Sequence, residues 1–212
     1  MKRTQRCMAW LLMLSIMLAA MPSAGAQAAA KPKTMAHAYY MIDAESGQKI
    51  LSSHANKRIC PASTVKLLTA LTVLDYADLN QKIKYTRKPQ KKILKTGRVY
   101  TVRQYLNMLL IVSDAGSALA LAEGTAGNVD DFVDMMNDKA EELGMKHSHF
   151  DNPVGLDKGS GYNQTYTTAA DFIKVAKAAM EEPVIARIVA KHKYRTSSYS
   201  LVTATASGSA LT

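Results

Sequence analysis

The stretch that decides the fold reads Arg58-Ile-Cys-Pro-Ala-Ser-Thr-Val-Lys-Leu-Leu-Thr-Ala-Leu71 and continues to Asp75. From Ser63 onwards, apolar residues occupy nearly every face of a helix, which predicts a helix buried in the core. Pro61 is typical of a helix start, because its fixed φ suits the first turn and its missing N–H is not needed there. We therefore expect a buried helix over residues 63–75.

Ser63 and Lys66 stand three residues apart at the start of this helix. Residues at this spacing share one helical face, so Lys66 Nζ is expected to approach Ser63 Oγ. An apolar pocket lowers the pKa of a lysine, and the neutral amine can then accept the serine proton. The helix N-terminus directs free N–H groups towards an oxyanion formed on attack. The pair predicts a serine nucleophile with a lysine base, and the alternative is a helix cap beside a surface lysine.

Patterns on either side predict a mixed α and β domain. Two β-prone runs, 38–43 and 48–52, flank a turn and predict a hairpin, whose partner strands are expected after residue 200 because two strands alone are marginal. A helix is expected to begin at a capping box, Thr101-Val-Arg-Gln104, and to run to Val112, and a second is expected from the polar break at Ser113-Asp114 through Ala122. Two more are expected, over 129–143 up to Gly144 and over 168–182 up to Pro183. A turn is expected at Asn152-Pro-Val-Gly155, and weak strand character covers 194–202.

The first 30 residues have the layout of a targeting segment. They contain no acid, and Lys2, Arg3 and Arg6 precede an apolar run over 8–21 and then Ala24-Gly25-Ala26. This order is typical of a secretory signal peptide, and the alternative is a membrane anchor that is retained. We expect residues 1–26 to be cleaved, the protein to be exported, and residues 27–212 to form one domain.

Composition narrows the classes of function. The 212 residues are 48% hydrophobic and 21% charged, which is the balance of a globular protein rather than a disordered one.

Cys60 would remain alone after loss of Cys7, so we expect no intramolecular disulfide and interpret Cys60 as a packing residue. His147 and His149 lack the spacing of a metal site and are interpreted as part of a solvated loop. Neither a Gly-x-Ser-x-Gly elbow nor a phosphate-binding glycine loop occurs in the sequence.

A strongly basic stretch covers residues 82–103. It holds nine basic side chains and no acid: Lys82, Lys84, Arg87, Lys88, Lys91, Lys92, Lys95, Arg98 and Arg103. It is either a solvated surface or a surface attracted to anionic wall polymer or lipid headgroups. Nucleic acid is not expected as a partner, because the protein is exported and few aromatic residues interrupt the basic ones.

The stretch over 58–71 resembles the active-serine segment of the D-alanyl-D-alanine carboxypeptidases, the low-molecular-mass penicillin-binding proteins of peptidase family S11. Other segments resemble the same family in the same order: 38–52, 100–106 with 109–113, 120–123, 132–137, 143–144 and 150–156. The resemblance implies an α/β fold (α+β in some schemes), with a sheet flanked by helices. It also implies a bacterial cell-envelope enzyme that needs no metal or cofactor.

The reaction that the resemblance implies is acyl transfer from a D-Ala-D-Ala peptidoglycan stem peptide to Ser63, with Lys66 as the base. β-Lactams would acylate the same serine. The second family motif, Ser-x-Asn, matches Ser113-Asp114-Ala115, so Ser113 is the third catalytic candidate while Ala115 replaces the asparagine. Two alternatives stay open: a catalytically inactive remnant with a binding role, and a serine β-lactamase.

The third family motif, Lys-Thr-Gly, should follow the second. Lys95-Thr96-Gly97 precedes it and lies inside the basic stretch, so we do not assign it as the motif. The motif is expected beyond Leu201, where the sequence reads Val-Thr-Ala-Thr-Ala-Ser-Gly-Ser-Ala-Leu-Thr212. We therefore expect a catalytic domain that is incomplete at its C-terminus.

Overall fold

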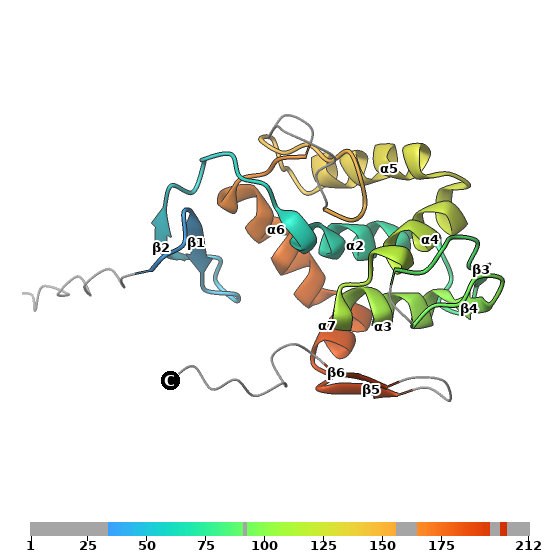
Figure 1. Ribbon diagram of the computed structural model, residues 1–212. Helices are drawn as coiled ribbons and strands as arrows, with labels where there is room; N and C mark the ends of the chain where they lie inside the picture. The colour runs from blue at the N-terminus through green and yellow to red at the C-terminus, as the bar shows by residue number, and fades with distance from the viewer. Residues whose placement is uncertain (1–33, 91–92, 156–164, 196–199, 203–212) are drawn as a thin grey trace, which may run out of the picture. The chain divides into compact units, whose positions relative to one another are not determined.

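The segment around Ser63 forms the central helix of the fold. A computed structural model describes residues 34–90, 93–155, 165–195 and 200–202, so the predicted signal segment lies outside the described residues. Residues 36–212 make up one compact unit. In it, a short 3-10 helix η1 (Ala62–Val65) leads into α2 (Lys66–Tyr76). Helix α2 packs against α3 (Val102–Val112), α4 (Ala115–Ala126), α5 (Val129–Glu142) and α6 (Ala169–Glu181) (Figure 1).

The predicted buried helix is confirmed, but its first turn is tighter than expected. Ala62 has a positive φ of 46°, and the backbone N–H of Thr64 donates to the carbonyl of Pro61 over 3.2 Å. The Thr64 hydroxyl donates to the same carbonyl over 2.6 Å. These bonds close a 3-10 turn around Ser63, so the α-helix itself begins at Lys66.

Within the described ranges, five further helices follow, each begun by a side-chain cap. They are α3 (Val102–Val112), α4 (Ala115–Ala126), α5 (Val129–Glu142), α6 (Ala169–Glu181) and α7 (Pro183–Val189). The expected capping box at Thr101 and Gln104 is present. Pro183 ends α6 as predicted, but it also starts α7, which was not predicted. The proline lacks the N–H that a continuing helix needs, yet it suits the first position of a new one.

The strands form three separate antiparallel pairs. The predicted hairpin is β1 (Tyr39–Ile42) with β2 (Lys49–Ser53), and β5 (Lys193–Arg195) pairs with β6 (Ser200–Val202). Residues 200–202 therefore pair with β5 rather than with the hairpin. Within the described residues, no third strand joins β1–β2. The hairpin instead packs one strand, β1, against α6.

The remaining pair, β3 (Lys82–Lys84) with β4 (Val99–Thr101), was not predicted because it lies within the basic stretch. The exposed and buried residues of β3 do alternate, because Lys82 and Lys84 are exposed while Ile83 between them is buried, but a single apolar residue between lysines is too weak a signal to predict a strand. Ile83 packs so closely on Gly124 of α4 that a larger residue there would collide with it. α4 continues through Gly124 to Ala126, beyond the expected end at Ala122.

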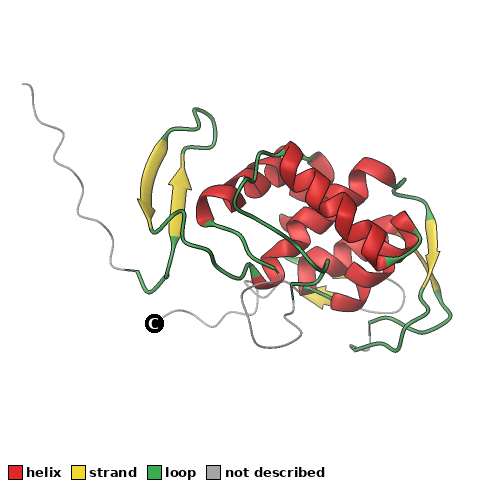
Figure 2. Ribbon diagram, turned by 90° about the horizontal axis from the view of Figure 1, so that it is seen from above, coloured by secondary structure: helices red, strands yellow, loops and turns green. Residues whose placement is uncertain are grey.

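The hydrophobic core lies among the helices, which Figure 2 shows packed together with strands at the margins. Val65, Leu68 and Val73 of the central segment are fully buried in it. Phe132 and Met136 bring the apolar face of α5 to the same core. No helix in the described ranges combines the length and the apolar character needed to cross a bilayer. The mixture of helices and strands agrees with the expected α/β class.

Candidate active site

Ser63 and Lys66 meet at the start of α2, as their spacing predicts. Lys66 Nζ lies 3.1 Å from Ser63 Oγ. Ser63 is exposed on η1, whereas the Lys66 side chain is only 3% exposed. A hydroxyl open to solvent is thus held against a buried amine. This combination distinguishes the pair from a helix cap beside a surface lysine.

A second contact holds Lys66 from a distant part of the chain. Lys66 Nζ donates to the carbonyl oxygen of Val154 over 2.7 Å. Val154 lies in the predicted turn, where Asn152 Oδ1 accepts the N–H groups of Val154 (3.0 Å) and Gly155 (2.7 Å). The hydroxyl of Thr69, one turn along α2 from Lys66, donates to the Pro153 carbonyl over 2.8 Å. The turn and the start of α2 therefore form one hydrogen-bonded unit.

Gly155 is the residue that lets this turn approach η1. Its φ is +77°, in the left-handed region that favours glycine. A Cβ at this position would overlap the Ala62 carbonyl and press on Val65. No other residue type fits this backbone contact, which brings the Val154 carbonyl to Lys66.

Side chains of neighbouring segments form hydrogen bonds with residues 150 and 151, which lead into the 152–155 turn, and hold the turn in place. Asn137 of α5 forms a two-way bond with the backbone of Phe150: its Nδ2 donates to the carbonyl over 2.7 Å and its Oδ1 accepts the N–H over 3.0 Å. The backbone N–H of Asp151 donates to Thr165 Oγ1 over 3.1 Å, and the Thr165 hydroxyl donates to Asp151 Oδ1. The sequence predicted the turn but not these hydrogen bonds, because the pattern of residues 150–155 does not indicate which distant side chains bond to it.

Ser113 lies at the end of α3, in an unusual backbone conformation. Its φ and ψ are 55° and 44°, the left-handed region, and its side chain is exposed. The next residue, Asp114, is 2% exposed and caps α4 by accepting from the N–H (2.7 Å) and hydroxyl (2.8 Å) of Ser117. Strained non-glycine residues of this kind cluster at functional sites, where surrounding structure maintains them. Both α3 and α4 pack on α2.

The sequence profile described as D-alanyl-D-alanine carboxypeptidase, peptidase family S11, matches residues 25–207. The chain belongs to this family. It is 38% identical over 165 residues to a D-alanyl-D-alanine carboxypeptidase of Mycobacterium tuberculosis, an alignment that covers 76% of this chain and 56% of the relative. It is 31% identical over 180 residues to one of Bacillus subtilis, covering 78% of the chain and 46% of the relative. The chain thus spans about half the length of these two relatives.

Solved structures agree with the family assignment. A crystal structure of a D-alanyl-D-alanine carboxypeptidase from Mycobacterium tuberculosis superposes with a TM-score of 0.74 at 34% identity, covering 82% of this chain and 68% of that one. A Streptomyces DD-transpeptidase superposes with a TM-score of 0.72 at 28% identity, covering 82% and 71%. The predicted family and the α/β fold class are therefore confirmed.

Two features of the S11 chain bear on its other motifs. Ala115 occupies the first position of α4, where the family motif predicts an asparagine; its methyl group packs on the core.

Lys95-Thr96-Gly97 lies in the loop between β3 and β4. The Gly97 N–H donates to the Tyr85 carbonyl over 2.7 Å, and the Thr96 hydroxyl donates to the Arg87 carbonyl over 2.8 Å. These bonds give the tripeptide a local role in the loop. The segment beyond Leu201, where the third motif is expected, lies outside the described residues apart from Val202.

The two histidines interpreted as loop residues serve as backbone anchors. The backbone N–H of His147 donates to Asp171 Oδ2 over 2.6 Å, and His149 forms an isolated antiparallel bridge with Tyr166. Burial would raise the pKa of Asp171, but hydrogen bonds from Lys174, His147 and Ser148 outweigh it and hold the pKa below its usual range. In the described part of the chain, no group of three His, Cys, Asp or Glu side chains is placed to hold a metal ion.

Proposed function

We propose that this chain is an exported serine D,D-carboxypeptidase that cleaves D-Ala-D-Ala termini of peptidoglycan stem peptides through an acyl-enzyme on Ser63. The observation that supports it is the 3.1 Å contact between an exposed Ser63 hydroxyl and a buried Lys66 amine. Membership of the S11 family supplies the substrate class.

The contacts of Lys66 suit a base. A neutral amine has two N–H groups and one lone pair, so one N–H can donate to the Val154 carbonyl while the lone pair faces the Ser63 hydroxyl. The neutral form is the one that burial favours for an amine. In the proposed reaction, Ser63 Oγ attacks the carbonyl of the penultimate D-alanine and Lys66 takes the hydroxyl proton.

Later steps return the proton and free the enzyme. The tetrahedral intermediate expels the terminal D-alanine, whose amine receives a proton from Lys66, with Ser113 as the relay. Water then attacks the acyl-enzyme, the ester bond to Ser63 breaks, and the shortened peptide leaves with a free carboxylate. A β-lactam would acylate Ser63 in the same first step, because its strained amide presents the same carbonyl.

Ala115 favours a second candidate, a protein of this fold with a binding role and little or no catalysis. An asparagine at this position would offer an amide to the lysine and to the substrate. The alanine methyl offers neither a donor nor an acceptor. The two candidates differ in whether Ser63 becomes acylated at a rate typical of an enzyme.

A fluorescent penicillin separates these candidates. We expect covalent labelling of the full chain, located on Ser63 by mass spectrometry, and no label on the Ser63→Ala variant. Ser46→Ala is the matched control, since it removes an exposed hydroxyl from the β1–β2 turn without touching α2. Label that survives Ser63→Ala would remove the assignment of the nucleophile. A wild-type chain that takes no label would favour the binding role.

Export and surface attraction complete the proposal. Cleavage of residues 1–26 predicts that exported protein begins at Gln27, within about three residues, which N-terminal mass spectrometry reads directly. The basic stretch is proposed to attract anionic wall polymer or lipid headgroups. Lys82, Lys84, Lys88 and Lys95 support this, because all four side chains are exposed.

A further inference from the structure

A small cavity lies between α3 and α7, separate from the pair at Ser63. Its volume is about 160 Å³, and it is lined by Arg103, Asn107, Val184, Arg187, Ile188 and Lys191. Arg103 is the second residue of α3, whereas Ser113 follows the last one. A helical rise of 1.5 Å per residue therefore separates their backbones by roughly 15 Å. The cavity is thus at the opposite end of α3 from the second motif.

Three of the six lining residues are cations, and none is an acid. Among the described residues, no carboxylate lies within ion-pair distance of Arg103, Arg187 or Lys191; the ion pairs found there involve other side chains. Burial, and then the positive charge of Arg103, lower the pKa of Lys191. Arg103 and Lys191 therefore repel each other across the cavity, and an anion bound between them would relieve that repulsion.

Two of the side chains that line the cavity, Asn107 and Lys191, are held in place before any ligand arrives. Asn107 is 2% exposed, and its Oδ1 accepts from Lys191 Nζ over 2.7 Å while its Nδ2 donates to the Arg103 carbonyl over 2.7 Å. Lys191 Nζ also lies 5.2 Å from the ring centroid of Tyr194. One buried amide thus links α3 to the segment that follows α7 and holds Lys191 at the cavity, which reduces the ordering cost of binding.

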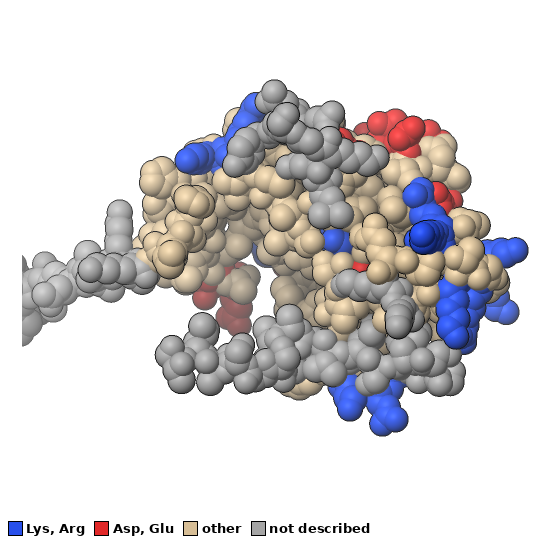
Figure 3. Space-filling model, viewed as in Figure 1, with Lys and Arg blue, Asp and Glu red and all other residues tan. Residues whose placement is uncertain are grey.

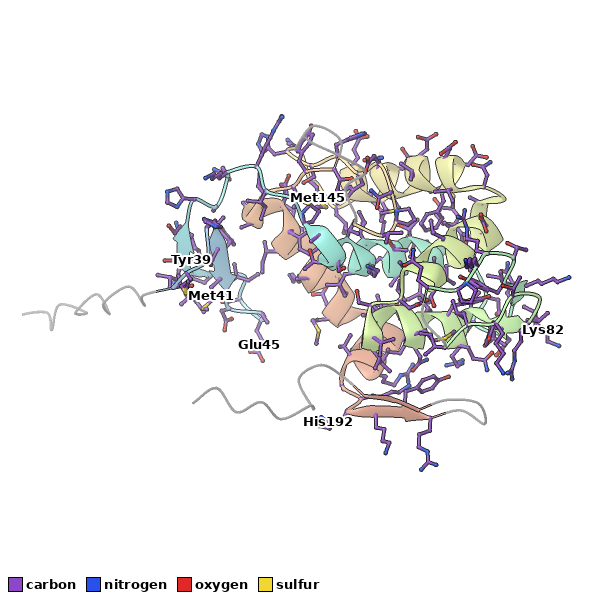
Figure 4. The ribbon with its side chains drawn as sticks, viewed as in Figure 1. Tyr39, Met41, Glu45, Lys82, Met145 and His192 are labelled. Atoms are coloured by element: carbon purple, nitrogen blue, oxygen red, sulfur yellow. The ribbon has the colours of Figure 1, made fainter. Side chains whose placement is uncertain are left out.

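The chain that follows Glu182 carries the same sign of charge as the cavity. Residues 183–195 contain Arg187, Lys191, His192, Lys193 and Arg195 and no acid. Figure 3 shows basic side chains over β3–β4 and below β5, whereas acids gather over α5. His192 directly precedes β5 (Figure 4), in which Lys193 and Arg195 are exposed while Tyr194 packs against the core. Such a field raises the local concentration of anions around the cavity.

We propose that the α3–α7 cavity binds a single phosphate group. Guanidinium groups match phosphate oxygens two at a time, and Val184 and Ile188 supply apolar walls that strengthen the attraction. Sites for whole small molecules measure roughly 300–1,000 Å³, so this cavity suits one phosphate and not a nucleotide. The phosphate belongs either to a phosphodiester polymer or to a phospholipid headgroup.

Calorimetric titration of the full chain with inorganic phosphate, at constant ionic strength, tests the site. We expect the Arg187→Gln/Lys191→Gln double variant to bind about tenfold more weakly or worse, because two charged hydrogen-bond donors are lost. Lys49→Gln/Lys146→Gln is the matched control, since it removes the same charge from exposed positions outside both the cavity lining and the basic stretch and should bind as the wild type does. Equal weakening in both double variants would overturn the site.

A single variant and a second ligand make the test of the cavity more specific. Arg187 is exposed on α7, so Arg187→Gln alone should weaken binding without changing the melting temperature; unchanged binding would count against the site. Acetate is the ligand control, and acetate bound as tightly as phosphate would contradict the proposed chemistry. Neither readout involves acylation of Ser63, so failure here is distinct from failure of the proposed function.

Two probes distinguish a phosphodiester polymer from a phospholipid headgroup as the source of the phosphate. An oligomer of glycerol phosphate represents the polymer, and vesicles of phosphatidylglycerol represent the lipid, with phosphatidylcholine vesicles as the neutral reference. The probe whose binding is lost in Arg187→Gln/Lys191→Gln and retained in Lys49→Gln/Lys146→Gln identifies the source. If neither probe shows that pattern, the site does not serve an envelope phosphate and the proposal is wrong.

Discussion

Gly155→Ala should damage both the fold and the proposed chemistry, and Gly47→Ala is its matched control. Both glycines have positive φ, +77° and +70°. A Cβ at Gly47 would meet nothing within 4 Å, whereas one at Gly155 would overlap the carbonyl of Ala62. Each substitution therefore carries the left-handed backbone penalty of roughly 1–2 kcal/mol, but only Gly155→Ala adds a collision with backbone.

The collision has to be relieved by moving the 152–155 turn away from η1. That movement carries the Val154 carbonyl away from Lys66, to which it is now bonded over 2.7 Å. A displacement of about 1 Å at a reacting group can cost on the order of a hundredfold in rate. We expect Gly155→Ala to acylate with penicillin about a hundredfold more slowly, while Gly47→Ala acylates at the wild-type rate.

Two measurements separate the effects. Urea unfolding should show a loss of about 1–2 kcal/mol for Gly47→Ala and a larger loss for Gly155→Ala, and stopped-flow fluorescence gives the acylation rates of the folded proteins. If Gly155→Ala unfolds and acylates as Gly47→Ala does, the turn is not what positions Lys66, and the reasoning from the close approach fails.

Three further predictions test other parts of the fold and site. Ala115→Asn should speed acylation of Ser63 by about tenfold in the same assay, because it restores one hydrogen-bonding amide; a slower variant would contradict the role given to that position. Asp171→Asn should lower the free energy of unfolding by about 2 kcal/mol at pH 7. Since the pKa of Asp171 is depressed in the folded state, the stability it contributes is complete above its unfolded pKa and is lost as the pH falls through its folded pKa. Urea melts from pH 7 to pH 3 should therefore show the two proteins converging in acid, and a constant difference would refute the charge-based account. Thr101→Ala should cost about 1 kcal/mol by removing the capping box of α3, and an unchanged urea midpoint would show that the cap is not stabilising.

Local patterns predicted the helices well, because each signal and its effect lie within a few residues. Thr101 and Gln104 cap each other, Gly144 ends α5 with a positive φ, and the apolar run after Ser63 forms the core helix. The same logic failed for β3–β4, where exposed lysines masked a single buried Ile83. Local patterns also did not predict α7, because a proline after a helical run indicates the end of that helix and does not show that another begins.

Ser63 and Lys66 could be identified as candidate nucleophile and base without a structure, since they are neighbours on one turn and meet wherever that turn forms. The replacement of the motif asparagine by Ala115 was equally visible in the residue order. The contact of Lys66 with the Val154 carbonyl, 88 residues away, and the role of Gly155 in permitting it became visible only in the folded chain. The same holds for the approach of Arg103 to Arg187 and Lys191. A sequence pattern reports on near neighbours, whereas contacts between distant segments depend on how whole helices and turns pack.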